Sequence, residues 1–199
     1  MCIRDRADGP DLARAAAAAG FDDPAAAAEA LRRLARGPRP RGRAKDPAEA
    51  LPGPPPADSP YAKDAEAVVH ADGASRGNPG PAAYGCVYLA DDGTPLCAEG
   101  EAIGKATNNV AEYRGALAAL ERLSRWGVDR VRLRLDSQLV VRQLEGTYRV
   151  KDEGLKPLHA RARRLLDGFA VAAVEHVPRA ENALADRVAN AALDEARAG

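Results

Sequence analysis

Within residues 128–137, VDRVRLRLDS, charged and apolar side chains alternate strictly from Arg130 to Asp136. In an extended chain Val131, Leu133 and Leu135 lie on one face, while the intervening arginines and Asp136 lie on the other. This period of two predicts a β-strand with one buried and one polar face. The strand ends on an aspartate, and the ends of sheet strands are common places for chemistry.

In the segments around this strand, apolar residues recur every two residues in some stretches and about every 3.6 residues in others. We expect further strands at 65–72, 82–91, 94–104 and 170–179, with a hairpin turn at 91–93. We expect helices at 107–127, 138–145, 157–167 and 182–196. Asn109 is the expected N-cap of the first helix, and Glu112 lies where a capping box places its acid. The order predicts an α/β fold, with a mixed five-stranded sheet flanked by helices.

Three regions differ in composition. Residues 1–36 are rich in alanine and could form a helix at 24–35, although the first six residues, MCIRDR, fit no pattern. Residues 37–60 are rich in proline and are expected to be a semi-rigid linker, and residues 61–199 the folded domain. Seven basic and no acidic residues lie between Leu31 and Lys45. That segment is either a solvated tail or an auxiliary contact to nucleic acid.

Overall charge and cysteine content exclude several classes of protein. The 29 basic and 29 acidic residues balance, which argues against a protein that coats polyanions but not against a nucleic-acid enzyme with an acidic site. The three cysteines form no CxxC pair, so neither a zinc site nor a disulfide framework is indicated. No apolar run approaches the roughly 20 residues of a membrane span, and no signal peptide is visible. We therefore expect a cytoplasmic protein that does not associate with membranes.

Four acids lie near the ends of the predicted elements. They are Asp72, Glu112, Asp136 and Asp186. Each has an ordinary explanation of its own, such as a turn residue or a helix cap. If the fold brings them together, their charges require compensation, and carboxylate oxygens suit Mg²⁺ or Mn²⁺. Two such ions can activate water and stabilise the leaving oxygen of a phosphodiester.

Four sequence blocks surround these acids and occur in a familiar order. They are DGASRGNPGPAAYG, TNNVAEYRGALAAL, LRLDSQLVVRQL and VPRAENALADRVAN. In this order and at these separations, the blocks resemble the type 1 ribonuclease H family across some 130 residues, 66–193. The resemblance implies a ribonuclease H-like fold and hydrolysis of the RNA strand of an RNA–DNA hybrid, giving 3′-hydroxyl and 5′-phosphate ends.

The resemblance also implies roles for individual residues. Asp72, Glu112, Asp136 and Asp186 would hold two Mg²⁺ ions, with Mn²⁺ as an alternative. Arg179 would interact with the scissile phosphate or help product leave. The expected substrate-binding residues are Gly73, Ala74, Ser75, Asn78, Thr107, Asn108, Asn109, Gln138 and Asn182. Several of these would sense the RNA 2′-hydroxyl, which DNA lacks, and Thr107 and Asn78 would meet a DNA phosphate.

The chain departs from part of the family pattern. No histidine lies between Val177 and Asp186, where many members have a catalytic helper, and His176 falls within a predicted strand. His70 shares the face of Asp72, but we expect it to be structural. No basic protrusion follows the DSQ helix, so the sequence matches the short bacterial and archaeal form. We expect the basic segment Leu31 to Lys45 to supplement hybrid binding.

Other functions remain open from the sequence. A catalytically silent or differently specific nucleic-acid-binding module could have the same fold, and other nucleases of the superfamily also use clustered acids. A phosphate-binding P-loop is disfavoured because GASRGNPG has no GK[ST] ending and no helix after it. We expect a monomer whose partner is an RNA–DNA hybrid.

Overall fold

The structure is a computed structural model that describes residues 50–198. Every element discussed below lies in the unit Leu51–Gly199. The expected helix at 24–35, the basic segment Leu31 to Lys45 and the first six residues lie outside the described residues.

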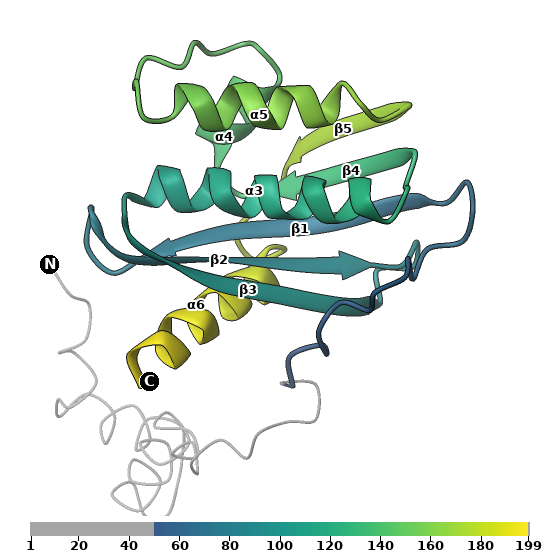
Figure 1. Cartoon of the computed structure of the whole chain (residues 1–199), viewed down its shortest axis with the longest axis horizontal. Coiled ribbons are helices and arrows are strands. Elements are labelled where there is room, and N and C mark those ends of the chain that lie inside the picture. The colour runs from purple at the N-terminus through teal and green to yellow at the C-terminus, as the bar shows by residue number, and fades with distance from the viewer. Residues whose placement is uncertain (1–49, 199) are drawn as a thin grey trace, which may run out of the picture. The chain divides into compact units, whose positions relative to one another are not determined.

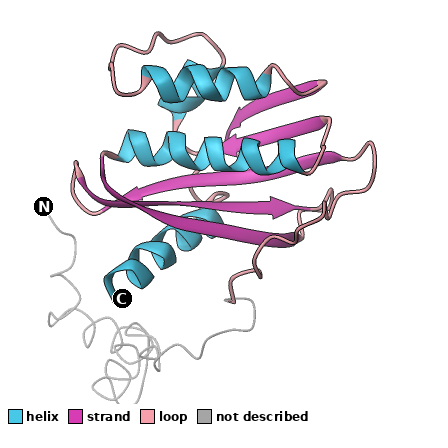
Figure 2. Ribbon diagram, in the orientation of Figure 1, coloured by secondary structure: helices cyan, strands magenta, loops and turns pink. Residues whose placement is uncertain are grey.

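Nine elements follow one another along the described chain (Figures 1 and 2). They are β1 (Glu66–Ser75), β2 (Gly80–Leu89), β3 (Pro95–Ala106), α3 (Asn108–Arg125), β4 (Arg130–Leu135), α4 (Gln138–Leu144), α5 (Lys156–Leu166), β5 (Val171–His176) and α6 (Ala183–Ala198). The strands form one five-stranded sheet in the order β3-β2-β1-β4-β5. The predicted mixed sheet with flanking helices is confirmed, with element ends moved by a few residues.

The sheet joins an antiparallel half to a parallel half at β1. Strand β1 pairs antiparallel with β2 and parallel with β4, so the C-terminal ends of β1 and β4 lie at the same edge. Helix α3 contacts β1 and β2 on one face, and α6 contacts β1, β2 and β3 on the other (Figure 1). The alternation expected in β4 is confirmed, because Val131, Leu133 and Leu135 are fully buried.

Two glycines let these helices approach the sheet closely. A side chain at Gly73 would collide with the backbone of Ala111 and Glu112 on α3. A side chain at Gly85 would collide with the backbone of Ala185 and Ala189 on α6. Since Gly85 pairs with Asp72 across β1 and β2, both close contacts lie beside the same aspartate. Backbone-to-backbone packing at these points requires residues without a Cβ.

The start of α3 differs from the sequence expectation. Thr107, not Asn109, is the N-cap, and its side chain accepts a hydrogen bond of 3.3 Å from the Val110 amide. Asn108 and Asn109 are the first residues inside the helix and are exposed. Both the Asn109 cap and the capping-box role of Glu112 are therefore wrong. Thr, like Asn, is a good cap, and sequence alone places a helix start only within a residue or two.

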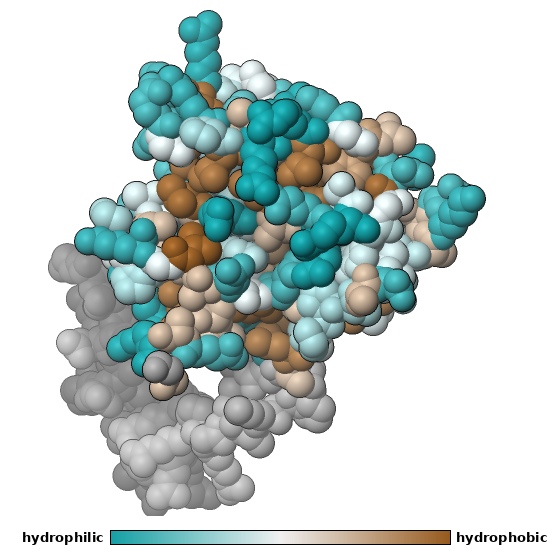
Figure 3. Space-filling view, in the orientation of Figure 1, coloured by the Kyte–Doolittle hydropathy of each residue, from teal (hydrophilic) through white to brown (hydrophobic). Residues whose placement is uncertain are grey.

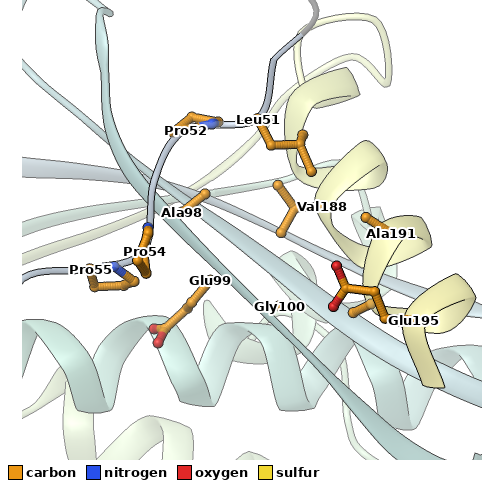
Figure 4. Close-up of a pocket in the computed structure, with 11 residues that line it drawn as sticks. Leu51, Pro52, Pro54, Pro55, Ala98, Glu99, Gly100, Val188, Ala191 and Glu195 are labelled. Atoms are coloured by element: carbon orange, nitrogen blue, oxygen red, sulfur yellow. The ribbon is translucent and has the colours of Figure 1, made fainter. Parts of the chain in front are cut away.

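Residues 51–56, which we call the proline strap, lie against the domain although they form no helix or strand. The Gly53 carbonyl accepts a hydrogen bond of 2.8 Å from the Ala98 amide of edge strand β3. The Pro56 carbonyl accepts one of 3.3 Å from the Trp126 indole. Figure 4 shows the strap beside β3 and α6, where it helps line a groove of about 340 Å³. The strap thus covers part of an edge that would otherwise present unpaired backbone groups.

The outer surface is mixed in polarity. On the face shown in Figure 3, hydrophilic and hydrophobic residues are interspersed, with hydrophobic patches between the charged side chains. None of the helices in the described part of the chain is long and apolar enough to span a membrane.

Candidate active site

Three carboxylates meet at the edge where β1 and β4 end. Asp72 lies in β1, and Asp136 directly follows β4, whose last residue, Leu135, pairs with Ala71. Glu112 reaches the same place from the beginning of α3. One oxygen of each of the three side chains lies within 4.8 Å of the others. Parallel neighbouring strands and the close approach of α3 at Gly73 therefore assemble the group.

Glu112 is the most deeply constrained of the three. Glu112 is 6% exposed, and its Oε1 accepts a hydrogen bond of 3.3 Å from the side-chain Nδ2 of Asn108. Its Oε2 is buried and has no hydrogen-bond partner among the described residues. Burial, followed by the nearby Asp72 and Asp136 charges, raises the pKa of Glu112 to about 9. A buried carboxylate oxygen without a partner is costly unless a cation occupies the space beside it.

Asp72 is held by its own strand. The Gly73 amide donates a hydrogen bond of 2.8 Å to Asp72 Oδ1. Burial and the charge of Asp136 raise the pKa of Asp72 to about 7, although the Gly73 amide and Arg179 act in the opposite direction. Neighbouring carboxylates disfavour each other's ionised form, which raises their pKa values and destabilises the folded protein. Proteins commonly keep such pairs at functional sites.

Asp186 is the fourth acid, on the first turn of α6. It lines the same cleft of about 220 Å³ as the other three, although it is not part of their 4.8 Å cluster. Arg179 donates a hydrogen bond of 3.2 Å to Asp186 Oδ1, and this bond raises the pKa of the arginine. The Arg179 side chain is 81% exposed, so the guanidinium can exchange this carboxylate for another anion.

The donor set fits a hard divalent cation. All four acids offer oxygen, the ligand type of Mg²⁺ and Mn²⁺. The unpaired Glu112 Oε2 and the raised pKa values of Asp72 and Glu112 indicate that protein groups alone do not balance this charge. A cation bound between the carboxylates would satisfy both observations.

The cleft brings together most of the residues expected from the sequence. Besides the four acids and Arg179, its lining contains Gly73, Ala74, Ser75 and Asn108. Asn78, Thr107, Asn109 and Gln138 do not line it. Asn78 is linked to it, because its Oδ1 accepts a hydrogen bond of 3.1 Å from the Asn108 amide. Gln138 is the exposed first residue of α4.

Two asparagines differ from the sequence expectation. Asn182 is 1% exposed and does not line the cleft, so it lies behind the carboxylates rather than on the surface that meets a ligand. Asn190, which sequence reasoning missed, does line the cleft and donates a hydrogen bond of 2.9 Å to the Asp186 carbonyl. Its position four residues after Asp186 on one helix is the signal that could have revealed it.

Two other expectations concern the family's variable parts. Residues 145–155 connect α4 to α5 without a further helix, which confirms that no helical protrusion is inserted there. His176 is the exposed last residue of β5 and does not line the cleft. Arg179 is therefore the basic residue that this region presents to the acids.

Comparisons with known proteins agree with this geometry. A family model described as "Reverse transcriptase-like" matches residues 70–192. The chain is 52% identical over 130 residues to "Ribonuclease HI" of Halobacterium salinarum, and the match covers 64% of this chain. It is 48% identical over 130 residues to "Bifunctional protein Rv2228c" of Mycobacterium tuberculosis, with 65% of this chain covered. The solved LC11-RNase H1 in complex with RNA/DNA hybrid superimposes with a TM-score of 0.62 at 40% identity, covering 65% of this chain and 98% of that one.

The halobacterial and mycobacterial relatives extend beyond the shared region. The chain matches 65% of the length of the halobacterial protein and 36% of the mycobacterial one. The shared part is the sheet with its acidic cleft, and the family model spans well over half of the chain. The chain therefore belongs to the reverse transcriptase-like family, and within it to the type 1 ribonuclease H proteins.

Proposed function

We propose that this protein is a metal-dependent endonuclease that cleaves the RNA strand of RNA–DNA hybrids and leaves 3′-hydroxyl and 5′-phosphate ends. The observation that carries the proposal is the cluster of three carboxylates within 4.8 Å, one with an unpaired buried oxygen. The solved relative bound to an RNA/DNA hybrid supports the choice of substrate.

Asp72, Glu112, Asp136 and Asp186 would hold two Mg²⁺ ions, with Mn²⁺ as an alternative. Bound there, the ions would supply an activated water and stabilise charge on the leaving oxygen. The protein would contribute fixed carboxylate positions. The Gly73 amide holds Asp72 at 2.8 Å, and the Asn182 side chain holds Asp136 at 2.9 Å. Such preorganisation avoids rearrangement during the reaction.

The remaining polar residues would orient the hybrid. Gly73, Ala74 and Ser75 present β1 backbone to the cleft beside Asn108, where a ribose 2′-hydroxyl would find both donors and acceptors. Thr107 and Asn78 would contact a phosphate of the DNA strand, with Asn109 and Gln138 flanking the substrate. Arg179 would leave Asp186 to meet the scissile phosphate, as its exposure allows.

A substrate and metal panel tests the proposal. The full chain is incubated with labelled RNA–DNA hybrid, double-stranded RNA or double-stranded DNA, each with Mg²⁺, Mn²⁺ or EDTA. We expect internal cleavage of the hybrid alone, dependent on metal and abolished in Asp136→Asn. Hybrid binding without cleavage would instead support a catalytically silent module. Cleavage that persists in Asp136→Asn would refute the metal-site assignment.

We further propose that the basic segment Leu31 to Lys45 strengthens hybrid binding, because the catalytic domain has no inserted basic helix. Deleting residues 1–49, which leaves the proline strap in place, should raise KM several-fold and flatten the dependence of KM on salt. Unchanged KM at 50 and 200 mM salt would contradict this role. We also propose that the protein is a monomer, which size-exclusion chromatography would test. We expect it in the cytoplasm, where such hybrids arise.

A further inference from the structure

Asn182 connects two strands behind the acidic cleft. Its Nδ2 donates hydrogen bonds of 3.0 Å to the Ala71 carbonyl and of 2.9 Å to Asp136 Oδ1. Both partners are acceptors, so only the amino end of the carboxamide can face them. The carbonyl end, Oδ1, is therefore turned away from Asp136. It is buried and has no hydrogen-bond partner among the described residues.

His70 presents the complementary group. It lies in β1 two residues before Asp72 and is 8% exposed. Its Nε2 is likewise buried without a partner in residues 50–198. Burial lowers the pKa of the imidazole, whereas interactions with the Asn182 side chain and the Glu181 backbone favour a proton on the ring. A neutral imidazole carries one N–H and can place it on Nε2.

We propose that His70 is a positioning residue: its Nε2–H donates to Asn182 Oδ1, which fixes the carboxamide that holds Asp136. The proposal rests on the proposed function, because it assigns His70 an effect on hydrolysis through Asp136. It satisfies two buried polar atoms at once, which is the usual state of such atoms in proteins. It also gives a task to a histidine that does not line the cleft.

The three residues come from different parts of the chain. His70 belongs to β1, Asn182 precedes α6, and Asp136 follows β4. The backbone amide of Asn182 donates a hydrogen bond of 3.1 Å to the Arg179 carbonyl, so Asn182 also closes the turn that carries Arg179. Without a donor at Oδ1, the carboxamide could rotate and turn its carbonyl towards Asp136, where it would repel the carboxylate. The consequence would fall on the geometry of Asp136 rather than on substrate affinity.

Replacement of His70 separates positioning from packing. His70→Leu fills the space but removes the donor, whereas His70→Gln retains a donor near the Nε2 position. We expect kcat on the hybrid to fall about 10-fold or more in His70→Leu, as for other outer-shell partners, with KM unchanged. His70→Gln should recover most of kcat. If His70→Leu does not fold, His70→Asn, whose amide ends short of Nε2, takes its place.

His159→Leu is the matched control. His159 is a half-buried histidine, and its Nε2 lies 3.0 Å from the Gln143 carbonyl, away from the cleft. This variant should lose thermal stability but keep kcat. If His70→Leu retains full kcat, or if His70→Gln loses as much kcat as His70→Leu, the positioning role is refuted.

A second readout in the metal-free protein does not depend on activity. The side-chain amide signals of Asn182 are identified in ¹⁵N spectra by their disappearance in Asn182→Ser. We expect these signals to shift and to exchange faster with solvent in His70→Leu, and to stay near their original positions in His70→Gln. Unchanged signals in His70→Leu would overturn the pairing. If the signals respond as expected while the unaltered protein does not cleave hybrid, the pairing stands and the proposed function fails.

Discussion

Two groups of acidic side chains in this domain have opposite surroundings. Along the sheet, Arg132 pairs with Glu66 at 2.9 Å and with Glu175, and Arg122 pairs with Glu99 at 2.5 Å. At the end of β1 and β4, carboxylates instead face one another within 4.8 Å. Arginines balance the charges of the first group. In the second group Glu112 Oε2 has no hydrogen-bond partner among residues 50–198, and the metal ions that we propose would balance its charge.

The difference shows which observation identifies a functional cluster. The number of acids does not, because both groups are rich in them. An unpaired Glu112 oxygen and raised pKa values for Asp72 and Glu112 distinguish the cleft. Clusters that cost stability are retained where they serve a function. The predictions below use Glu112 and Glu99 as a matched pair, one from each group.

The largest expected difference is in catalysis. Glu112→Gln should lower kcat on the hybrid by more than about 100-fold, since even outer-shell changes cost 10 to 100-fold. Glu99→Gln should leave kcat unchanged, because Glu99 pairs with Arg122 and Tyr88 and does not line the cleft. Steady-state kinetics of the two variants under the same Mg²⁺ concentration makes the comparison. Equal losses would remove the distinction between the two groups.

The second difference is in pH dependence without metal. The pKa of Asp72 is raised to about 7 and that of Glu112 to about 9, so between pH 5 and 9 the folded protein binds more protons than the unfolded chain. The free energy of unfolding in EDTA should therefore fall as pH rises, by roughly 1.4 kcal/mol per pH unit for each of the two groups that is still protonated, and hence more steeply below pH 7 than above it. Urea titrations from pH 6 to 9 measure this slope, and saturating Mg²⁺ should flatten it. A rise in stability over this range would contradict the assignment.

The third difference is in stability at a single pH. In EDTA at pH 8, Glu112→Gln should raise the melting temperature. With a pKa of about 9 in the folded protein, Glu112 must take up a proton on folding that the unfolded chain does not hold, and the neutral amide avoids this cost. Glu99→Gln should lower the free energy of unfolding by about 2 kcal/mol, because it removes a charged acceptor from Arg122. Thermal and urea unfolding of both variants, each beside the unaltered protein, test the opposite signs.

The smallest effect concerns the proline strap, which shares its groove with Glu99. A chain that begins at residue 61 should melt a few degrees below one that begins at residue 50, because it loses the Gly53 and Pro56 hydrogen bonds. Both should have the same kcat, since no strap residue lines the acidic cleft. A lower kcat in the shorter chain alone would show that the proline strap influences the acidic cleft, contrary to this prediction.

Periodicity was enough to predict the sheet, because apolar alternation and helical spacing both act over a few neighbouring residues. It also placed Asp72 and Asp136 at strand ends. If those two strands are parallel neighbours, the two aspartates must lie close together. The contact of Asn182 with Ala71 joins residues 111 positions apart and leaves no local trace. The packing of the proline strap against the domain could not be predicted either. Its composition indicates a lack of regular structure, but it does not reveal that Ala98 and Trp126 donate hydrogen bonds to it.

Gly73 and Gly85 have a consequence for how this sequence can evolve. Each is a contact point between backbones on either side of Asp72, so even a methyl group there would push α3 or α6 outwards. Substitutions elsewhere in the core can be absorbed by compensating changes in neighbouring side chains. At Gly73 and Gly85 the colliding atoms are mainly backbone atoms, which no substitution at a second site can remove. Lineages of this domain should therefore diverge freely over most of the sheet while these two positions stay invariant, even in descendants that have lost the acids.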